Sequence, residues 1–333
     1  MALAVQQMGL GLLTGKPEAV AGGLMHRLYR ICCGGKSYAV KILNAQIMRR
    51  PKAIGNMAYA EGIAKRFAGM VPAVYALEKD GKQLQQLEGR FFLVYPWQQG
   101  ESIFAPCIGE EHCLKMGRFL GRIHKIALRP EKTAEGETRE RTADTWPDLS
   151  GWPDAPWAVA LAEALPALKR LRIGAESAAA GLWQEQVISH RDLDPKNVLW
   201  HKGEAFLIDW EAAGPVNPWL ELAECLFYWT VTEQGEADEG LFHAFMTGYC
   251  EEKELSAMPV EAAFCASFGG MLAWLLYNAR RACGVEAADE EERAMGAAQV
   301  LSTLKDIQQK EALAEKYVAW LKEMQCAKTA MLS

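Results

Sequence analysis

The chain has 333 residues and half of them are apolar, so it can bury a sizeable core and could hold two lobes or domains. Its net charge of −6 argues against nucleic acid as a partner. Nine cysteines occur without a C-x-x-C pair, which argues against a zinc site and a disulfide framework and favours a reducing cytosol.

Targeting and membrane signals are missing from the pattern of apolar residues. The first sixteen residues have no basic region ahead of their apolar positions, so we expect no signal peptide. The longest uncharged apolar run, 262–277, is too short to cross a bilayer and is expected to be a buried helix. We therefore expect a soluble, cytoplasmic protein with no membrane partner.

The first predicted elements are β-strands separated by pairs of glycines. Residues 11–16 resemble a phosphate-binding Walker loop, but the spacing is one residue too short and Pro17 replaces the Ser or Thr that would bind magnesium. Strands are predicted at 19–21, 28–33 and 37–43. The pair Gly22-Gly23 lies between the first two, where it suits either a plain turn or a close backbone approach to a ligand.

A lysine lies inside the third of these strands. Lys41 follows Ala39 and Val40 and precedes Ile42, so its charge needs compensation. Glu61 is the only acidic residue between Lys41 and Glu78, and it lies in the stretch 56–68, which has helical character. Glu61 is therefore the expected partner, with a snorkelling lysine and a solvated glutamate as the alternative.

Further strands are predicted at 73–77, 83–87 and 90–95, so six strand segments are available for the expected five-stranded antiparallel sheet with one helix. The rest of the chain favours helices, because apolar residues recur at helical spacing. They are predicted at 110–128, 158–180, 218–231, 238–252, 256–282 and 287–327, with a surface loop at 129–157.

The stretch 187–211 carries the chemistry. Its apolar runs 198–200 and 205–208 are separated by a Gly-containing turn, which predicts a hairpin. That hairpin would bring Asp192, Asn197 and Asp209 together. Phosphoryl transfer needs such a trio: a carboxylate that orients the attacking hydroxyl and two oxygen ligands for Mg²⁺.

This stretch resembles the aminoglycoside phosphotransferase and choline kinase family, which shares the protein-kinase fold. The shared motifs are His190-Arg191-Asp192 with Asn197, then Ile208-Asp209-Trp210, then residues 218–223, which read Pro-Trp-Leu-Glu-Leu-Ala. Arg191 stands where the family usually has Gly, and Glu221 replaces its usual Asp. The first departure is protein-kinase-like, and the second concerns a structural position.

The resemblance implies an α+β fold with two lobes: an N-lobe at 1–95 with the five-stranded sheet and one helix, a hinge at 96–100, and a mainly helical C-lobe at 101–333. It implies that ATP and Mg²⁺ are the cofactors and that Asp192 is the catalytic base. The other implied roles are phosphate binding by Gly22, Gly23 and Lys41 with Glu61, adenine binding at the hinge by Tyr95, Pro96 and Gln98, and metal binding by Asn197 and Asp209.

The sequence indicates less about which residues bind the acceptor. Acidic clusters at 233–239 and 286–292 could attract a cationic substrate, although charge runs on helices are more often solvated faces. The aromatic residues Tyr228, Trp229, Trp274 and Tyr277 could form a cage for a cation but are more often core, and Asn278 and Arg280 are candidates to face the cleft.

The predicted function is transfer of the γ-phosphate of ATP to a hydroxyl of an aminoglycoside-like antibiotic or a related small molecule. A choline, ethanolamine or sugar-metabolite kinase is the alternative. A non-catalytic nucleotide-binding module would be expected to lack one of five polar positions, and all five are present: Lys41, Glu61, Asp192, Asn197 and Asp209. A protein kinase is disfavoured because only a short segment separates Asp209 from Glu221 and no Ala-Pro-Glu follows. The sequence does not specify an oligomeric state.

Overall fold

The computed structural model describes residues 1–20, 25–126, 145–255 and 258–332. The chain forms two compact units, the first made of Met1–Phe104 with Ser189–Gly214 and the second of Ala105–Ile188 with Pro215–Ser333. The first unit contains the antiparallel sheet and the second is mainly helical, so the predicted α+β kinase-like class is confirmed. Residues 189–214 pack within the same unit as the sheet.

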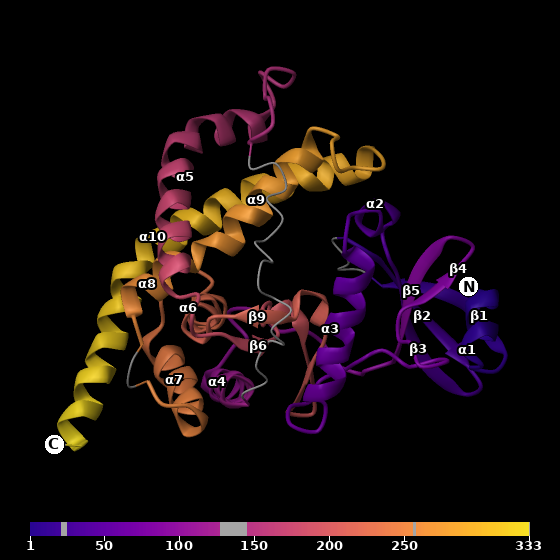
Figure 1. Ribbon diagram of the computed structural model, residues 1–333, viewed down its shortest axis with the longest axis horizontal. Helices are drawn as coiled ribbons and strands as arrows, with labels where there is room; N and C mark the ends of the chain where they lie inside the picture. Colours follow the sequence, from indigo (N-terminus) through magenta and orange to yellow (C-terminus); the bar gives the residue numbers. More distant parts are fainter. Residues whose placement is uncertain (21–24, 127–144, 256–257, 333) are drawn as a thin grey trace. The chain divides into compact units, whose positions relative to one another are not determined.

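The sheet of the first unit has five antiparallel strands in the order β1-β2-β3-β5-β4 (Figure 1). The strands are β1 (Leu13–Val20), β2 (Arg27–Cys33), β3 (Lys36–Ile42), β4 (Gln85–Leu87) and β5 (Arg90–Pro96). The first strand begins six residues before the predicted 19–21. The predicted strand at 73–77 is wrong: its N–H groups bond to different partners, Val74 to the Leu207 carbonyl and Leu77 to the Val94 carbonyl, so no ladder forms.

Helices cover both faces of this sheet, and the alternation of side chains along the strands decides which residues meet which helix. Phe92 and Val94 of β5 pack in one cluster with α1 (Ala2–Met8), whereas Leu93 and Tyr95 pack on the other face with Met57 of α3 (Ala53–Phe67). Figure 1 shows α1 and α3 on opposite sides of the sheet. Neither α1 nor the short helix α2 (Ala45–Met48) was predicted from the sequence pattern.

The central stretch forms the predicted hairpin, with β7 (Val198–His201) paired to β8 (Glu204–Leu207). Lys202 and Gly203 both have positive φ, as a tight two-residue hairpin turn requires. Two 3₁₀ turns flank the hairpin, η2 (Pro195–Asn197) and η3 (Trp210–Ala212). The short strands β6 (Val187–Ser189) and β9 (Gly214–Val216) pair with each other.

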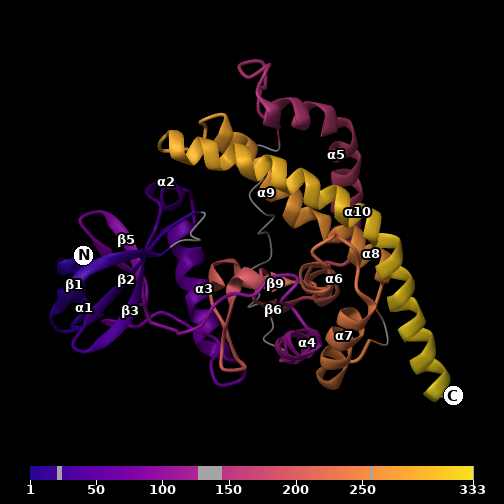
Figure 2. The same cartoon turned by 180° about the vertical axis from the view of Figure 1, so that it is seen from behind.

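The second unit consists of α4 to α10, and α10 lies along α9 in both ribbon views (Figures 1 and 2). The helices are α4 (Glu110–Lys125), α5 (Pro156–Gly181), α6 (Pro218–Trp229), α7 (Glu239–Glu252), α8 (Val260–Ala266), α9 (Phe268–Ala282) and α10 (Glu290–Leu332). The predicted helix 256–282 is therefore two helices that meet at Ser267. Of the predicted loop 129–157, the described residues 145–155 contain no helix or strand.

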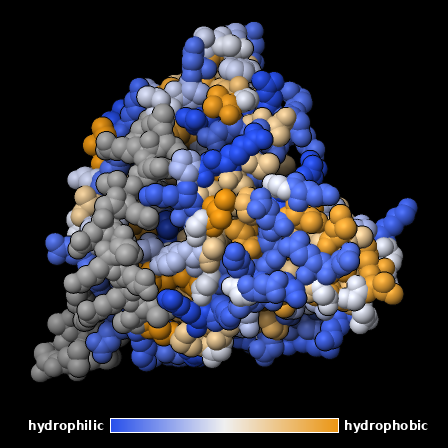
Figure 3. All heavy atoms as spheres, turned by 45° about the vertical axis from the view of Figure 1, so that its right-hand side comes forward, coloured by the Kyte–Doolittle hydropathy of each residue, from blue (hydrophilic) through white to orange (hydrophobic). Residues whose placement is uncertain are grey.

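Among the described residues, one stretch, Val260–Ala282, is long and apolar enough to cross a membrane. In the fold it comprises α8 and α9, and most of the apolar positions of α9 are buried against α5 and α10. The burial supports the interpretation of this stretch as core helices. On the face drawn in Figure 3, hydrophilic residues surround separate apolar patches.

Helices α4 and α7 approach each other at three glycines. A Cβ at Gly117 would lie 1.9 Å from the Phe245 carbonyl oxygen, and one at Gly248 would lie 2.0 Å from the Leu114 carbonyl oxygen. Gly121 is similarly blocked by the carbonyl of Tyr249. Only residues without a side chain allow this separation of the two backbones.

Candidate active site

Lys41 and Asp209 are 168 residues apart in sequence and form an ion pair. The Lys41 Nζ lies 2.8 Å from the Asp209 Oδ1. Lys41 extends from β3 on the face covered by α3, and Asp209 directly precedes η3. The strand lysine and the predicted metal ligand thus lie in one site, within the first unit.

A second carboxylate contacts the same ammonium group. The Glu211 Oε2 lies 2.5 Å from the Lys41 Nζ. Burial alone would lower the pKa of Lys41, but the two carboxylates outweigh it and raise that pKa. Burial would raise the pKa of Glu211, and Lys41 and His26 reverse this effect and lower it. Lys41 and Glu211 are therefore both charged over the ordinary pH range.

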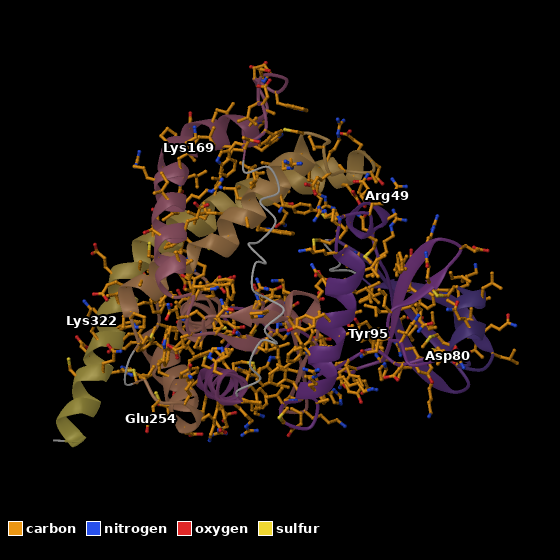
Figure 4. The ribbon with its side chains drawn as sticks, in the orientation of Figure 1. Arg49, Asp80, Tyr95, Lys169, Glu254 and Lys322 are labelled. Carbon is orange, nitrogen blue, oxygen red and sulfur yellow. The ribbon has the colours of Figure 1, made fainter. Side chains whose placement is uncertain are left out.

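The expected direct ion pair between Lys41 and Glu61 is replaced by other contacts. Glu61 is buried on α3, where its Oε1 accepts a hydrogen bond of 2.5 Å from the Tyr95 hydroxyl and its Oε2 accepts one of 2.9 Å from the Ala76 N–H. Burial raises the pKa of Glu61, while Tyr95, Ala76 and, at longer range, Lys41 lower it. Glu61 therefore serves to hold the 73–77 segment and Tyr95, which Figure 4 labels between α3 and the sheet.

The Asp192 carboxylate is fixed by two neighbours in its own loop. Its Oδ2 accepts a hydrogen bond of 2.8 Å from the Asn197 Nδ2, and its Oδ1 accepts one of 3.1 Å from the Lys196 Nζ. The Asn197 Nδ2 also donates to the Asp192 carbonyl at 2.8 Å. Lys196 is held in place by Asp194 as well, at 3.2 Å. These contacts fix the orientation of a carboxylate whose side chain is still 36% exposed.

His190 ties the Asp192 loop to the Asp209 loop. Its Nδ1 accepts the Asp192 N–H at 3.3 Å, so its Nε2 carries the proton and donates to the Ile208 carbonyl at 3.0 Å. The ring is fully buried beside Trp210, with 4.5 Å between the ring centroids. One imidazole thus joins the two motifs.

Arg191 adopts φ of +65°. An ordinary residue is strained in this left-handed region, and glycine is not. The glycine that Arg191 replaces in the resembling family would meet this requirement without strain. Asp209 also has a positive φ, of +59°. Two strained positions therefore flank the predicted chemistry.

The segment predicted as the hinge continues β5, whose backbone groups alternate in direction. Trp97 donates its N–H to the Ser37 carbonyl at 3.1 Å, and Val94 accepts from Leu77 on the opposite side of β5. Because carbonyls alternate along an antiparallel strand, the Pro96 carbonyl points to the side of Val94, away from β3. Gln98 follows β5, which ends at Pro96. Gly100 allows the chain to pass the hairpin, since a Cβ there would lie 2.8 Å from the Trp200 carbonyl oxygen.

The donor groups available to a metal are hard oxygens. With its Nδ2 bonded to Asp192, the Asn197 amide directs its Oδ1 elsewhere, and Asp209 keeps Oδ2 outside its bond to Lys41. The described residues contain no group of three or more His, Cys, Asp or Glu that could hold an ion. The two oxygens of Asn197 and Asp209 suit Mg²⁺, because this ion often takes only one or two protein ligands and completes its coordination with phosphates and water. The predicted Gly22 and Gly23 lie outside the described residues.

Glu221, the second departure from the family pattern, belongs to a buried network in the second unit. Its Oε2 lies 2.8 Å from the His124 Nε2, and the His124 Nδ1 lies 3.0 Å from the Tyr249 hydroxyl. The side chains of His124 and Glu221 are at most 1% exposed. This network joins α4, α6 and α7, and it supports the interpretation of Glu221 as structural.

The residues considered for the acceptor differ in how exposed they are and in their contacts. Trp229 and Asn278 are fully buried and cannot contact a substrate. Trp274 and Tyr277 lie side by side on α9 with ring centroids 5.5 Å apart, and the Trp274 Nε1 donates to Gln299. Arg280 pairs with Glu286 at 3.1 Å.

Three residues of the site were not predicted from the sequence pattern: Lys196, Glu211 and His26. Lys196 and Glu211 lie inside the two motifs, but only the Asp and Asn residues of these motifs were assigned roles. His26, whose Nε2 lies 3.3 Å from the Glu211 Oε2, gave no signal, because an isolated histidine before a strand is compatible with many roles.

With this geometry in place, comparisons with known proteins identify the family. Residues 17–255 match the phosphotransferase enzyme family. The chain belongs to this family. The predicted family and enzyme class, an ATP-dependent phosphotransferase with an alcohol group as acceptor, are thereby confirmed. No curated protein sequence matches the chain.

Solved structures of the same fold span several substrates. A spectinomycin phosphotransferase, solved with ADP and spectinomycin, has a TM-score of 0.64 at 13% identity, covering 93% of this chain and 96% of its own. An ethanolamine kinase from Plasmodium vivax has a TM-score of 0.57 at 13% identity, covering 87% and 82%. A choline kinase from Streptococcus pneumoniae has a TM-score of 0.56 at 16% identity, covering 91% and 97%. At such identities these structures show the fold of the phosphotransferase and leave its substrate undetermined.

Proposed function

We propose that this phosphotransferase is an ATP- and Mg²⁺-dependent kinase that phosphorylates a hydroxyl group of an aminoglycoside-like antibiotic or a related small molecule. The observation that supports this most strongly is the 2.8 Å ion pair of Lys41 and Asp209. It joins a strand lysine suited to phosphates with a carboxylate suited to a metal, beside the Asp192 loop.

Asp192 is the proposed base. Its Oδ1 and Oδ2 are held by Lys196 and Asn197, so the carboxylate needs little reorganisation when a hydroxyl approaches. The acceptor oxygen attacks the γ-phosphorus while its proton passes to Asp192. The bond from that phosphorus to the β–γ bridging oxygen breaks, and ADP leaves with the electron pair.

Lys41 would bind the α- and β-phosphates, and the Pro96 carbonyl and Gln98 N–H would bind adenine through two hydrogen bonds. Asn197 and Asp209 would hold the metal through their side-chain oxygens. Mg²⁺, when bound, neutralises charge that develops on the phosphates. Gly22 and Gly23 are proposed to contact the phosphates from the β1–β2 connection.

Amino alcohols such as ethanolamine and choline are the second candidate class of acceptor. The supporting observation is that kinases for them share the fold with TM-scores of 0.57 and 0.56, close to the 0.57 of an amicoumacin kinase solved with AMP-PNP and Ca²⁺. We also propose that the N-lobe ends at residue 95 and the C-lobe begins at residue 101, with a hinge between them. A cytoplasmic location is proposed as well.

The test is ATP turnover by the purified protein with Mg²⁺ against a panel of aminoglycosides, spectinomycin, macrolides, choline, ethanolamine and sugars. One acceptor should raise turnover well above background hydrolysis. Asp192→Asn should then lower kcat by about 10²- to 10⁴-fold and leave ATP affinity nearly unchanged. Asp194→Asn is the matched comparison two residues away: an asparagine can still accept the Lys196 N–H, and only the 3.2 Å ion pair to Lys196 is weakened, so kcat should fall far less than in Asp192→Asn. Full activity of the Asp192 variant would refute the assignment.

A further inference from the structure

Lys41 needs a partner that remains when the metal site is in use. Its side chain is 13% exposed, and its two partners are Asp209 and Glu211. If Asp209 is a metal ligand, its charge is shared with the ion and the phosphates. The nucleotide phosphates would then neutralise the ammonium on one side, and Glu211 is the carboxylate that continues to fix its position from the protein side.

Glu61 is not arranged to take that place. Each of its two carboxylate oxygens already accepts a hydrogen bond, one from Tyr95 and one from Ala76. These partners belong to the sheet and to the segment that precedes it. Swinging Glu61 toward Lys41 would leave a buried hydroxyl and a buried N–H without acceptors, which costs about 1–3 kcal/mol for each group.

Glu211 is held by a buried histidine. The His26 Nδ1 accepts the Asn44 N–H at 3.1 Å, so the neutral ring carries its proton on Nε2. That nitrogen lies 3.3 Å from the Glu211 Oε2, the same oxygen that contacts Lys41. His26 is 5% exposed. Its ring thus links the start of β2, the start of α2 and η3 at the lysine.

We propose that Glu211, oriented by His26, is the residue that positions Lys41 for the nucleotide phosphates, in place of Glu61. This proposal rests on the proposed kinase function, and it assigns the IDWE segment at 208–211 two tasks. Asp209 serves the metal, while Glu211 keeps the lysine ammonium in place.

A double-mutant cycle tests the coupling. Glu211→Gln should lower kcat/KM for ATP by about tenfold through a raised KM. In a Lys41→Met background the same substitution should have no further effect, because its target is gone. Glu61→Gln is the matched control: it should change kcat/KM for ATP by less than about threefold and lower the melting temperature, because its partners are structural.

His26 supplies a second arm if the Glu211 variant unfolds. His26→Gln can still donate to Glu211 and should retain more activity than His26→Ala at equal folded fraction. Equal losses in these two variants, or undiminished loss from Glu211→Gln in the Lys41→Met background, would overturn the proposal. So would full recovery of Glu211→Gln at high Mg²⁺, which would make Glu211 a metal ligand.

Measurements on the wild-type protein distinguish failure of this inference from failure of the proposed function. If no acceptor stimulates turnover, the proposed function fails, and the same cycle is measured on the Kd of a non-hydrolysable ATP analogue with Mg²⁺. Coupling of Glu211 to Lys41 in that Kd would support the inference alone. Its absence, or no binding of the analogue by the wild type, would refute it.

Discussion

The close approach of α4 and α7 makes Gly117→Ala a sharp test of the second unit. A Cβ at this position would lie 1.9 Å from the Phe245 oxygen and 2.8 Å from its carbon, both backbone atoms that cannot rotate away. Real Cβ contacts essentially never fall below 3.0 Å. Helix α7 would have to move by more than 1 Å, and the contacts at Gly121 and Gly248 would loosen with it.

The magnitude follows from two opposing effects. The higher helix propensity of alanine would stabilise α4 by about 1 kcal/mol relative to glycine. Overpacking costs about 1–3 kcal/mol, and a clash with rigid backbone belongs at the upper end. We therefore expect a net loss of about 2 kcal/mol, which in a unit of this size lowers Tm by about 4–8 °C.

The assay is thermal and urea unfolding followed by circular dichroism. Gly62→Ala in α3 is the control, because a Cβ there meets nothing within 4 Å and should raise stability slightly. Should Gly117→Ala unfold at or above the wild-type temperature while the control behaves as expected, the backbone contact inferred between α4 and α7 would be wrong.

Three further predictions concern charged groups. Burial lowers the pKa of Lys310 to about 8 from the usual 10.5, so the unfolded chain binds more protons between those values and stability should rise with pH across that window; in Lys310→Met this rise should be smaller in urea titrations. Lys196→Met should lower kcat about tenfold, because Asp192 loses a neighbour that orients it, with little change in the thermal shift caused by ATP. Asp209→Asn should weaken Mg²⁺ binding and therefore raise the Mg²⁺ concentration that gives half-maximal turnover. An unchanged concentration would exclude Asp209 as a ligand.

Local patterns sufficed for much of the fold and for the hairpin with its candidate site residues. The hairpin at 198–207 could be predicted because its strands are adjacent in sequence and its turn contains glycine. The polar positions at 192, 197 and 209 follow from that hairpin. The segment 73–77 was misassigned, because an apolar run does not reveal whether its N–H groups share one partner strand or several.

The partner of Lys41 shows where sequence reasoning ends. By itself the sequence determined that a lysine inside an apolar strand needs a carboxylate and that Asp192, Asn197 and Asp209 belong to one loop. Glu61 was the nearest acidic residue along the chain. Only the tertiary structure decided that the carboxylates at the lysine are Asp209 and Glu211, about 170 residues away, because electrostatic attraction depends on distance in space. Glu61 found its partners in Tyr95 and Ala76 for the same reason.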